Sequence, residues 1–383
     1  MREVVIIDGI RSAVGKRNGS LRNTRPDDLA GAVIKGLVER TGIDPALVDD
    51  VILGCVSQIG EQTGDIARVA ALIAGLPITV PGTTIDRQCG SSQQAVHFAA
   101  QAILSGDMDI VIAGGVESMS RIPIGSSYQG VKPSEQLTKH YEIIHQGLSA
   151  ERIAEKYQFT RAQLDEFSYH SHEKALLAQA ENRFKNEIMP MKLLDDDGAT
   201  FTFNQDEGPR KGTSIEKLGG LKPSFKENGI IHAGNASQIS DGAGALLIMS
   251  AEKAHELGLK PRFKIITRIV IGSDPTLMLT GPIAATEKVL QKSGLTLADM
   301  DVFEVNEAFA SVPLAWLKET GANANKLNPN GGAIALGHPL GASGARLLLT
   351  MMSELDRTEG RYGLQTMCEG MGMANATIIE KIF

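Results

Sequence analysis

Short runs of uniformly apolar residues alternate with segments in which apolar residues recur every three or four positions. The uninterrupted runs have the length of buried strands and lie at residues 4–7, 51–55 and 108–113. The segments with helical spacing lie at residues 29–38, which Gly42 ends, and at residues 66–74. Apolar strands between helices are typical of a sheet that is covered on both faces. This part of the chain therefore predicts an α/β unit.

The pattern changes after Met119. Residues 121–139 are rich in Gly, Ser, Pro and Lys, and we expect them to form a loop. Residues 195–220 are polar with little periodicity, and they are too long for an ordinary connection. Two helices are predicted between these segments, at residues 149–157 and at residues 161–182 with Thr160 as N-cap. Residues 120–234 are therefore interpreted as a loop domain inserted into the first unit.

Strand and helix patterns return in the last third of the chain. The predicted strands lie at residues 240–249, 263–270, 301–305, 364–367 and 376–379. The predicted helices lie at residues 283–293, 314–319 and 342–355. The order of a small-residue turn, a helix, a strand and a glycine pair occurs twice, once from Cys89 to Gly115 and once from Gly341 to Gly372. This echo predicts a duplicated α/β architecture.

Composition limits the class of protein. The 383 residues are 42% hydrophobic and 22% charged with a net charge of −7, which is typical of a globular protein. No basic tract interleaves with aromatic residues, so nucleic acid is not an expected partner. No apolar run approaches the roughly 20 residues that span a bilayer, and the first eight residues are too short and acidic for a signal peptide. Three cysteines form no disulfide framework, so we expect a cytoplasmic enzyme.

Cys89 is the first candidate for chemistry. It ends a short β-branched and polar run, and small residues and a helical pattern follow it. This places the thiol where a loop enters a helix, where free N–H groups and the helix dipole favour a thiolate. We therefore predict a nucleophile that is reactive near neutral pH. The alternative is that Cys89 is a small buried hydrophobic residue, as we expect for Cys55.

Three further reactive side chains stand in loops rich in glycine. Asn306 directly follows a predicted strand, His338 lies in a glycine-rich segment, and Cys368 follows a strand and precedes Glu369-Gly370. Glycines beside such groups let backbone N–H groups approach a substrate oxygen. Each residue alone has a structural alternative, as a surface histidine, a core cysteine or a turn asparagine.

Together, these stretches resemble the thiolase family of acetyl-CoA C-acyltransferases, over essentially all 383 residues. The resemblance rests on an ordered set of motifs: the Cys89 segment, Gly114 to Ser120, Gly234-Asn235-Ala236-Ser237, Asn306-Glu307-Ala308-Phe309, Gly337 to Gly344 with His338, and Cys368-Glu369-Gly370. It implies duplicated α/β domains in a layered α-β-α-β-α arrangement with an inserted loop domain. The implied bounds are residues 1–119 and 235–259, 120–234, and 260–383.

The resemblance also implies a division of labour in the site. Cys89 attacks an acyl-CoA thioester and becomes acylated, and His338 takes its proton. Cys368 moves the proton at the α-carbon of the second acyl group. His338 and a water held by Asn306 donate to the thioester oxygen, and the N–H groups of Cys89 and Gly370 form a second oxyanion hole. The reaction is Claisen condensation of two acyl-CoA molecules or CoA-dependent cleavage of a 3-ketoacyl-CoA.

Coenzyme A is the implied substrate and product, and the inserted region is implied to bind it. The matching positions are Arg210 near the nucleotide, Ser237 at the pantetheine, Phe225 and Met278 beside it, and His145 near the thioester. No nucleotide fingerprint or metal-ligand spacing is present, so no tightly bound cofactor is expected. Residues 121–139 match the loops that form oligomers in the family, so we expect a homo-oligomer.

Several features depart from the commonest family pattern and concern the acyl pocket. Met371 stands where many members have Gly, and Gln88, Gln93 and Gln94 differ from the short-chain biosynthetic type. Two other functions stay open at this point. A non-catalytic CoA-ester binding protein would not need both Cys89 and Cys368. A hydrolase would need an activated water at the position of Cys368.

Overall fold

The computed structural model describes residues 2–383, and its strands form two sheets. The strands are β1 (Val4–Arg11), β2 (Gly15–Lys16), β3 (Asp50–Gly54), β4 (Gly82–Ile85), β5 (Ile110–Ser118), β6 (Met191–Leu194), β7 (Thr200–Phe203), β8 (Ser240–Ser250), β9 (Phe263–Gly272), β10 (Val302–Val305), β11 (Tyr362–Glu369) and β12 (Met373–Lys381). The helices are α1 (Pro26–Thr41), α2 (Ile66–Ile73), α3 (Ser91–Ser105), α4 (Glu135–Thr138), α5 (Gln146–Tyr157), α6 (Arg161–Ala180), α7 (Ile215–Gly219), α8 (Ala251–Glu256), α9 (Gly281–Ser293), α10 (Ser311–Thr320), α11 (Ala333–Leu336) and α12 (Ser343–Thr358).

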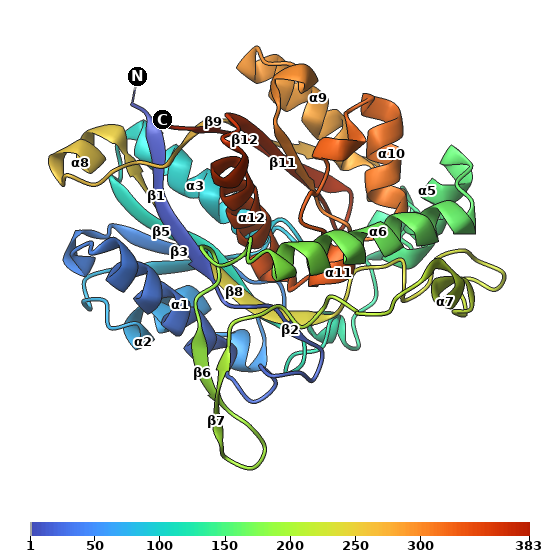
Figure 1. The fold of residues 1–383 in the computed structure, drawn as a ribbon, viewed down its shortest axis with the longest axis horizontal. Helices are drawn as coiled ribbons and strands as arrows, with labels where there is room; N and C mark the ends of the chain where they lie inside the picture. The colour runs from blue at the N-terminus through green and yellow to red at the C-terminus, as the bar shows by residue number, and fades with distance from the viewer. Residues whose placement is uncertain (1) are drawn as a thin grey trace.

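The large sheet is built from two halves with the same internal pattern (Figure 1). In the first half, β1, β8 and β5 pair antiparallel, and β5, β3 and β4 then pair parallel. In the second half, β9, β12 and β11 pair antiparallel, and β11 and β10 pair parallel. The halves join where β1 and β9 pair at Val5 and Ile6. The predicted duplication is therefore confirmed in the strand pairing.

Hydrophobic clusters define five layers. One cluster joins α1 and α2 to the outer face of the first half, and another joins α9 and α10 to the outer face of the second. A third cluster places α3 and α12 between the two halves. The resulting order is helices, strands, helices, strands, helices, which confirms the predicted layered arrangement. The catalytic candidates lie at the ends of elements in the middle three layers.

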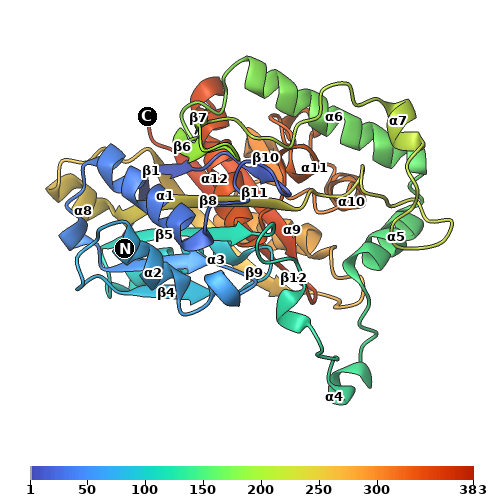
Figure 2. The same ribbon diagram turned by 90° about the horizontal axis from the view of Figure 1, so that it is seen from below.

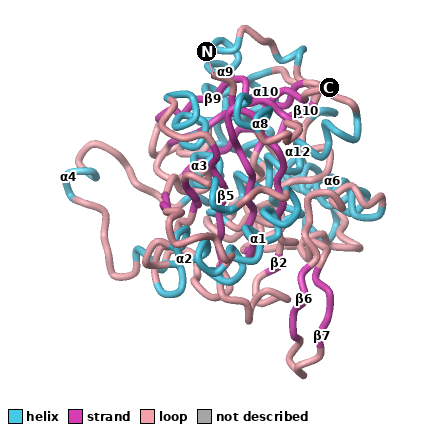
Figure 3. The backbone as a smooth tube through the Cα atoms, turned by 90° about the vertical axis from the view of Figure 1, so that its left-hand side faces the viewer, coloured by secondary structure: helices cyan, strands magenta, loops and turns pink. Residues whose placement is uncertain are grey.

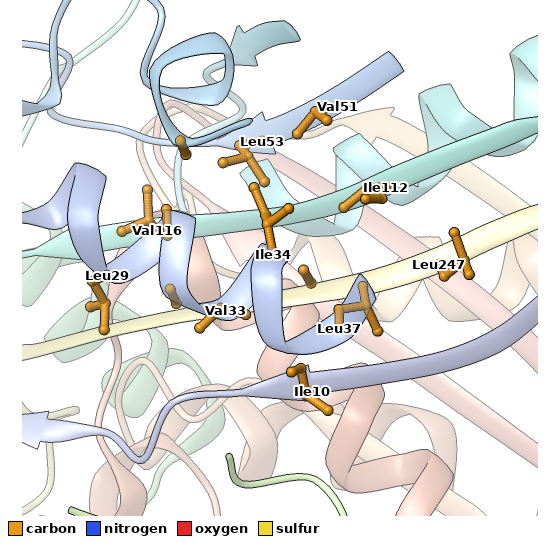
Figure 4. Packing of buried hydrophobic residues seen from close by; sticks show 14 of the residues in the cluster. Ile10, Leu29, Val33, Ile34, Leu37, Val51, Leu53, Ile112, Val116 and Leu247 are labelled. Atoms are coloured by element: carbon orange, nitrogen blue, oxygen red, sulfur yellow. The ribbon is translucent and has the colours of Figure 1, made fainter. Parts of the chain in front are cut away.

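The first outer cluster shows why the amphipathic pattern of α1 produces this packing. Ile34 and Leu37 on α1 point into a core that also contains Leu53 and Ile112 from the sheet (Figure 4). All four side chains are at most 1% exposed. Burial of each large apolar side chain stabilises the fold by about 1.5–3 kcal/mol. The helix ends before Gly42, as predicted, and the φ of +66° at Gly42 forms a left-handed cap.

Most predicted elements are confirmed with shifted ends. The predicted strand at residues 108–113 is β5, which runs on to Ser118, and the predicted helix at residues 161–182 is α6. Thr160 accepts a hydrogen bond from the backbone of Gln163, whose side chain bonds back to Thr160, so the N-cap is a complete capping box. The segment at residues 195–220 contains regular structure. The strand β7 and the helix α7 lie within it, and β7 pairs with β6 just before it.

The region between β5 and β8 leaves the layered body and returns to it. Figure 2 shows α4 on an arm that projects from the molecule, and Figure 3 shows the β6–β7 hairpin projecting separately. The helices α5 and α6 instead pack against the second half through a cluster that includes Ile153, Leu164 and Phe309. Within residues 2–383, no helix has both the length and the apolar character needed to cross a bilayer.

Candidate active site

Cys89 lies in a tight turn that connects β4 to α3, two residues before the helix begins. The preceding residue, Gln88, has a φ of +49°, a conformation that costs a non-glycine residue about 1 kcal/mol or more. Hydrogen bonds hold the turn in place: the Ser91 hydroxyl donates to the Gln88 carbonyl at 2.7 Å and accepts from the Arg87 N–H at 2.9 Å. The predicted position of the thiol at a helix entrance is therefore confirmed.

The surroundings of Cys89 oppose the predicted thiolate at neutral pH. Cys89 is 6% exposed, and burial together with the charge of Glu369 raises the pKa of its thiol to about 12. A backbone hydrogen bond acts in the other direction but is the weaker effect. The helix entrance does not compensate for the loss of hydration of the buried thiol. Ionisation of Cys89 therefore requires a nearby base that takes the proton as the bond to substrate forms.

His338 has the protonation state that such a base needs. The Ser343 hydroxyl donates to the Pro339 carbonyl at 2.8 Å, so it accepts from Nδ1–H of His338 at 2.6 Å. These two hydrogen bonds leave Nε2 of His338 without a proton, and the Asn306 amide nitrogen lies 3.4 Å from Nε2. Burial, with the charge of Arg346, lowers the pKa of His338 to about 3. The imidazole is therefore neutral at pH 7 and can accept a proton at Nε2.

Asn306 directly follows β10, and its backbone N–H donates to the carbonyl of Thr366 on β11 at 3.1 Å. The side chain is 1% exposed. Its Oδ1 atom is buried and has no hydrogen-bond partner within residues 2–383. A buried, unpaired amide oxygen provides an acceptor for a water or a substrate group beside His338.

Cys368 is the second-last residue of β11, two residues before Gly370. The thiol is fully buried, and burial with the charge of Cys89 raises its pKa well above the ordinary value. Because the charge of Cys89 acts on Cys368, the two thiols lie near each other although they belong to different halves. Gly370 lies against Gln88, because a Cβ built on Gly370 would come within 2.8 Å of the Gln88 amide oxygen. The structure thus brings the predicted loops together.

A buried carboxylate holds the loop that follows His338. Glu117, at the end of β5, accepts backbone hydrogen bonds from Val56 at 2.9 Å, Ser57 at 3.1 Å and Gly341 at 2.9 Å. Gly341 also needs to be a glycine, since a Cβ there would lie 2.5 Å from the Val116 carbonyl. These contacts fix the His338 loop of the second half against the first half.

The candidate CoA contacts gather partly around aromatic side chains. The rings of His145 and Phe225 stack with centroids 5.2 Å apart, and Phe225 meets Phe309 edge-on at 5.8 Å. Met278 is 3% exposed, has a φ of +55° and belongs to the same cluster as Phe225, Phe309 and Cys368. Ser237 is half-buried, and its N–H donates to the Ala308 carbonyl at 2.9 Å.

Comparison with known proteins identifies the family. Residues 4–252 match the family model of the thiolase N-terminal domain, and residues 259–381 match that of the thiolase C-terminal domain. The chain belongs to the thiolase family. It is therefore a thiolase, an acyltransferase that acts on acyl-CoA thioesters.

Individual relatives cover this thiolase over its full length. It is 50% identical to the steroid 3-ketoacyl-CoA thiolase FadA6 of Mycobacterium tuberculosis, with 100% of this chain and 95% of that protein covered. It is 44% identical to the 3-oxoadipyl-CoA/3-oxo-5,6-dehydrosuberyl-CoA thiolase of Escherichia coli, with both chains fully covered. The crystal structure of the Bacillus anthracis acetyl-CoA acetyltransferase is 39% identical and superimposes with a TM-score of 0.92, covering 100% of this chain and 99% of that one.

Arg210 of this thiolase is exposed on a segment that the body of the protein anchors firmly. Asp206, four residues earlier, accepts two hydrogen bonds from Arg11 at 2.7 and 2.9 Å and one from the Val14 N–H at 2.7 Å. Arg11 also donates to Glu187 at 2.8 Å. The backbone N–H of Arg210 donates to Nδ1 of His172 at 3.2 Å. The guanidinium is therefore presented to solvent from a fixed backbone.

Three residues of this thiolase have site contacts that the sequence analysis did not assign. Ser343 selects the tautomer of His338, Glu117 fixes the His338 loop, and Glu369 lies against the Cys89 turn. Ser343 stands five residues after His338 in the same glycine-rich motif, which is a signal that could have found it. Glu117 and Glu369 reach partners far away in the sequence, so no local pattern reveals their contacts.

Proposed function

We propose that this thiolase transfers acyl groups through a thioester on Cys89. The supporting observation is the buried, neutral His338, whose unprotonated Nε2 lies beside the Asn306 amide, together with the two buried thiols Cys89 and Cys368. His338 takes the Cys89 proton while the sulfur attacks the acyl-CoA carbonyl and CoA leaves as the thiol. Because the free thiolate is unfavourable there, proton transfer and attack are coupled.

In the second half-reaction, Cys368, with its sulfur deprotonated, takes a proton from the α-carbon of a second acyl-CoA. The resulting carbanion attacks the acyl-enzyme carbonyl to form the new C–C bond, and the Cys89 sulfur leaves and takes the proton from Cys368. As the carbanion forms, the thioester oxygen of that acyl-CoA gains negative charge and receives a hydrogen bond from a water held by Asn306, and one from His338 only while Nε2 of His338 carries a proton. The N–H groups of Cys89 and Gly370 donate hydrogen bonds to the carbonyl oxygen of the acyl-enzyme. Donors that are fixed before the reaction stabilise such charge most effectively in a dry site. In the cleavage direction, the same groups act in reverse order.

We further propose that residues 120–234, inserted between residues 1–119 and 235–259, provide most of the CoA site, while residues 260–383 provide Asn306, His338 and Cys368. The His145–Phe225 stack and Met278 form an apolar wall suited to pantetheine, and Ser237 lies at its edge. Arg210 is the cation for a phosphate of the nucleotide. A tightly bound cofactor is not required for this chemistry.

The arm at residues 121–139 supports a homo-oligomer of at least two copies. Ile124, Tyr128 and Val131 on it are 51%, 57% and 65% exposed, although apolar side chains of this size are usually covered. The arm projects away from the body (Figure 2) and offers these side chains to a second copy. Three free, buried cysteines also suit a reducing compartment such as the cytoplasm.

A single assay separates this proposal from hydrolysis or simple binding. Acetoacetyl-CoA is incubated with the enzyme, with and without free CoA, and the products are separated by chromatography. Thiolysis yields two molecules of acetyl-CoA and depends on free CoA. Consumption of acetoacetyl-CoA without added CoA, with release of free acid, indicates a hydrolase, and no turnover indicates a binding protein.

A further inference from the structure

Glu369 is a buried carboxyl beside the two candidate thiols. It is the last residue of β11 and is 0% exposed, and both of its oxygens lack a hydrogen-bond partner within the described residues 2–383. A charged carboxylate without partners is strongly disfavoured in a protein interior. The protonation state of Glu369 can therefore change, because no ion pair holds the carboxylate in its charged form.

The carboxyl lies directly against the Cys89 turn. A Cβ built on Gly90 would come within 2.0 Å of Oε1 of Glu369 and 2.9 Å of Nδ2 of Asn375. Asn375 donates to the Gly90 carbonyl at 3.2 Å, so both side chains contact the same backbone. Met367, two residues before Glu369 on β11, belongs to the same hydrophobic cluster as Cys89. This strand face therefore supports the nucleophile, and Gly90 makes the close approach of the carboxyl possible.

The charged and titratable groups around Glu369 are few. On the Cys89 turn, Arg87 favours the carboxylate, Asp86 opposes it, and the charge of Glu369 in turn raises the pKa of Cys89. On its own strand the neighbour is Cys368, whose pKa the charge of Glu369 also raises. Burial is the largest influence on Glu369 and, with these charges, raises the pKa of its carboxyl to about 8.

We propose that Glu369 is a positioning residue whose buried carboxyl, seated against Gly90, controls how readily the Cys89 thiol gives up its proton. The proton-bearing carboxyl places no charge beside the nucleophile at neutral pH. At alkaline pH the carboxylate forms and opposes a thiolate on Cys89. Other thiols become more reactive at alkaline pH. The Glu369 carboxylate limits this increase in reactivity for Cys89.

This inference rests on the proposed function only in taking Cys89 as the nucleophile, and its test does not require turnover. The test measures the rate at which iodoacetamide alkylates Cys89 from pH 6 to 10, by peptide mass, in the full-length protein and in Glu369→Gln. The wild-type rate should flatten near pH 8. In Glu369→Gln the flattening should be absent, with alkylation about tenfold faster at pH 9.5 and within twofold of wild type at pH 6.5.

Two further variants make the result decisive. Glu304→Gln is the matched control, because Glu304 is also buried with both oxygens unpaired and its pKa is likewise raised by burial to about 8, but its charge does not act on Cys89. It should keep the flattening near pH 8. Arg87→Met removes the cation that favours the Glu369 carboxylate, so the flattening should move to higher pH. This variant decides the question if Glu369→Gln does not fold.

The proposal is overturned if Glu369→Gln and wild type show the same pH profile, if Glu304→Gln loses the inflection as Glu369→Gln does, or if Arg87→Met leaves it in place. These results would leave Cys89 as nucleophile intact. Loss of the proposed function has a different signature, because a Cys89→Ala enzyme that still performs thiolysis refutes the nucleophile without changing the alkylation profile of the wild-type thiol.

Discussion

The buried Arg11 cluster allows a prediction in which an effect on stability and an effect on the CoA site have one cause. Arg11 at the end of β1 is 1% exposed and donates to both Asp206 and Glu187. Asp206 in turn anchors the segment that carries Arg210. Replacing Arg11 by Met keeps most of the apolar stem but removes the cation. Two buried carboxylates then lose their shared partner.

The size of the effect follows from burial. Removing one partner of a buried ion pair costs about 3–5 kcal/mol, because the remaining charge stays buried without compensation. The matched control is Arg22→Met, since Arg22 pairs with Asp196 at the surface, where the side chains are 38% and 69% exposed. An exposed pair of this kind contributes about 0–1 kcal/mol. The two variants remove the same chemical group and differ mainly in its burial.

Urea unfolding followed by circular dichroism measures the difference. We expect Arg11→Met to lower the free energy of unfolding by about 3–5 kcal/mol with an unchanged dependence on urea. Its KM for CoA in thiolysis should rise, because the backbone that presents Arg210 loses its anchor, whereas Arg22→Met should leave the KM for CoA unchanged. A loss below about 1 kcal/mol for Arg11→Met, or equal losses for both variants, would refute the reasoning.

Four shorter predictions concern the site and the assembly. Cys89→Ala should form no acyl-enzyme with acetyl-CoA, whereas Cys368→Ala should show the acetyl adduct by intact mass but form acetoacetyl-CoA about 10²–10⁴-fold more slowly; an adduct on neither variant would contradict this. Iodoacetamide should modify Cys89 faster than Cys55, whose thiol is fully buried and whose pKa burial raises further, and equal modification in peptide maps would count against it. Phe225→Ala should raise the KM for CoA about tenfold with little change in kcat, because the stack with His145 is lost. Phe225→Leu should have a smaller effect. A loss of kcat with an unchanged KM would contradict a role of Phe225 in CoA binding. Light scattering at micromolar concentration should give at least a dimer, and a monomer mass would exclude an interface formed by residues 121–139.

The elements that the sequence predicted are those whose signals are local. Thr160 as N-cap and Gly42 as helix end are set by hydrogen bonds and backbone angles within a few residues, and both are confirmed. The β6–β7 hairpin escaped prediction because its strands are four residues long and carry few buried side chains. Such strands are stabilised by pairing with each other, which periodicity does not reveal.

The site shows the same division between local and distant causes. The sequence placed Cys89 at the entrance of a helix, and this is confirmed. Burial and Glu369, a residue 280 positions away, raise the pKa of its thiol, and the local sequence around Cys89 reveals neither influence. The hydrogen bond from His338 to Ser343 lies within one motif, but its meaning depends on the Pro339 carbonyl accepting from the same hydroxyl. The sequence alone does not specify which of these groups donates each hydrogen bond and which accepts it.

The position of β8 between β1 and β5 has a consequence for synthesis on the ribosome. β8 pairs with both of these strands, yet Ser118 at the end of β5 and Ser240 at the start of β8 enclose the whole excursion. Translation proceeds at about 5–20 residues per second, so β8 is synthesised on the order of ten seconds after β5. During this time β1 and β5 present unpaired edges and the Cys89 turn has no second half to cover it. We therefore expect the nascent chain to depend on chaperone binding until residue 250 has emerged.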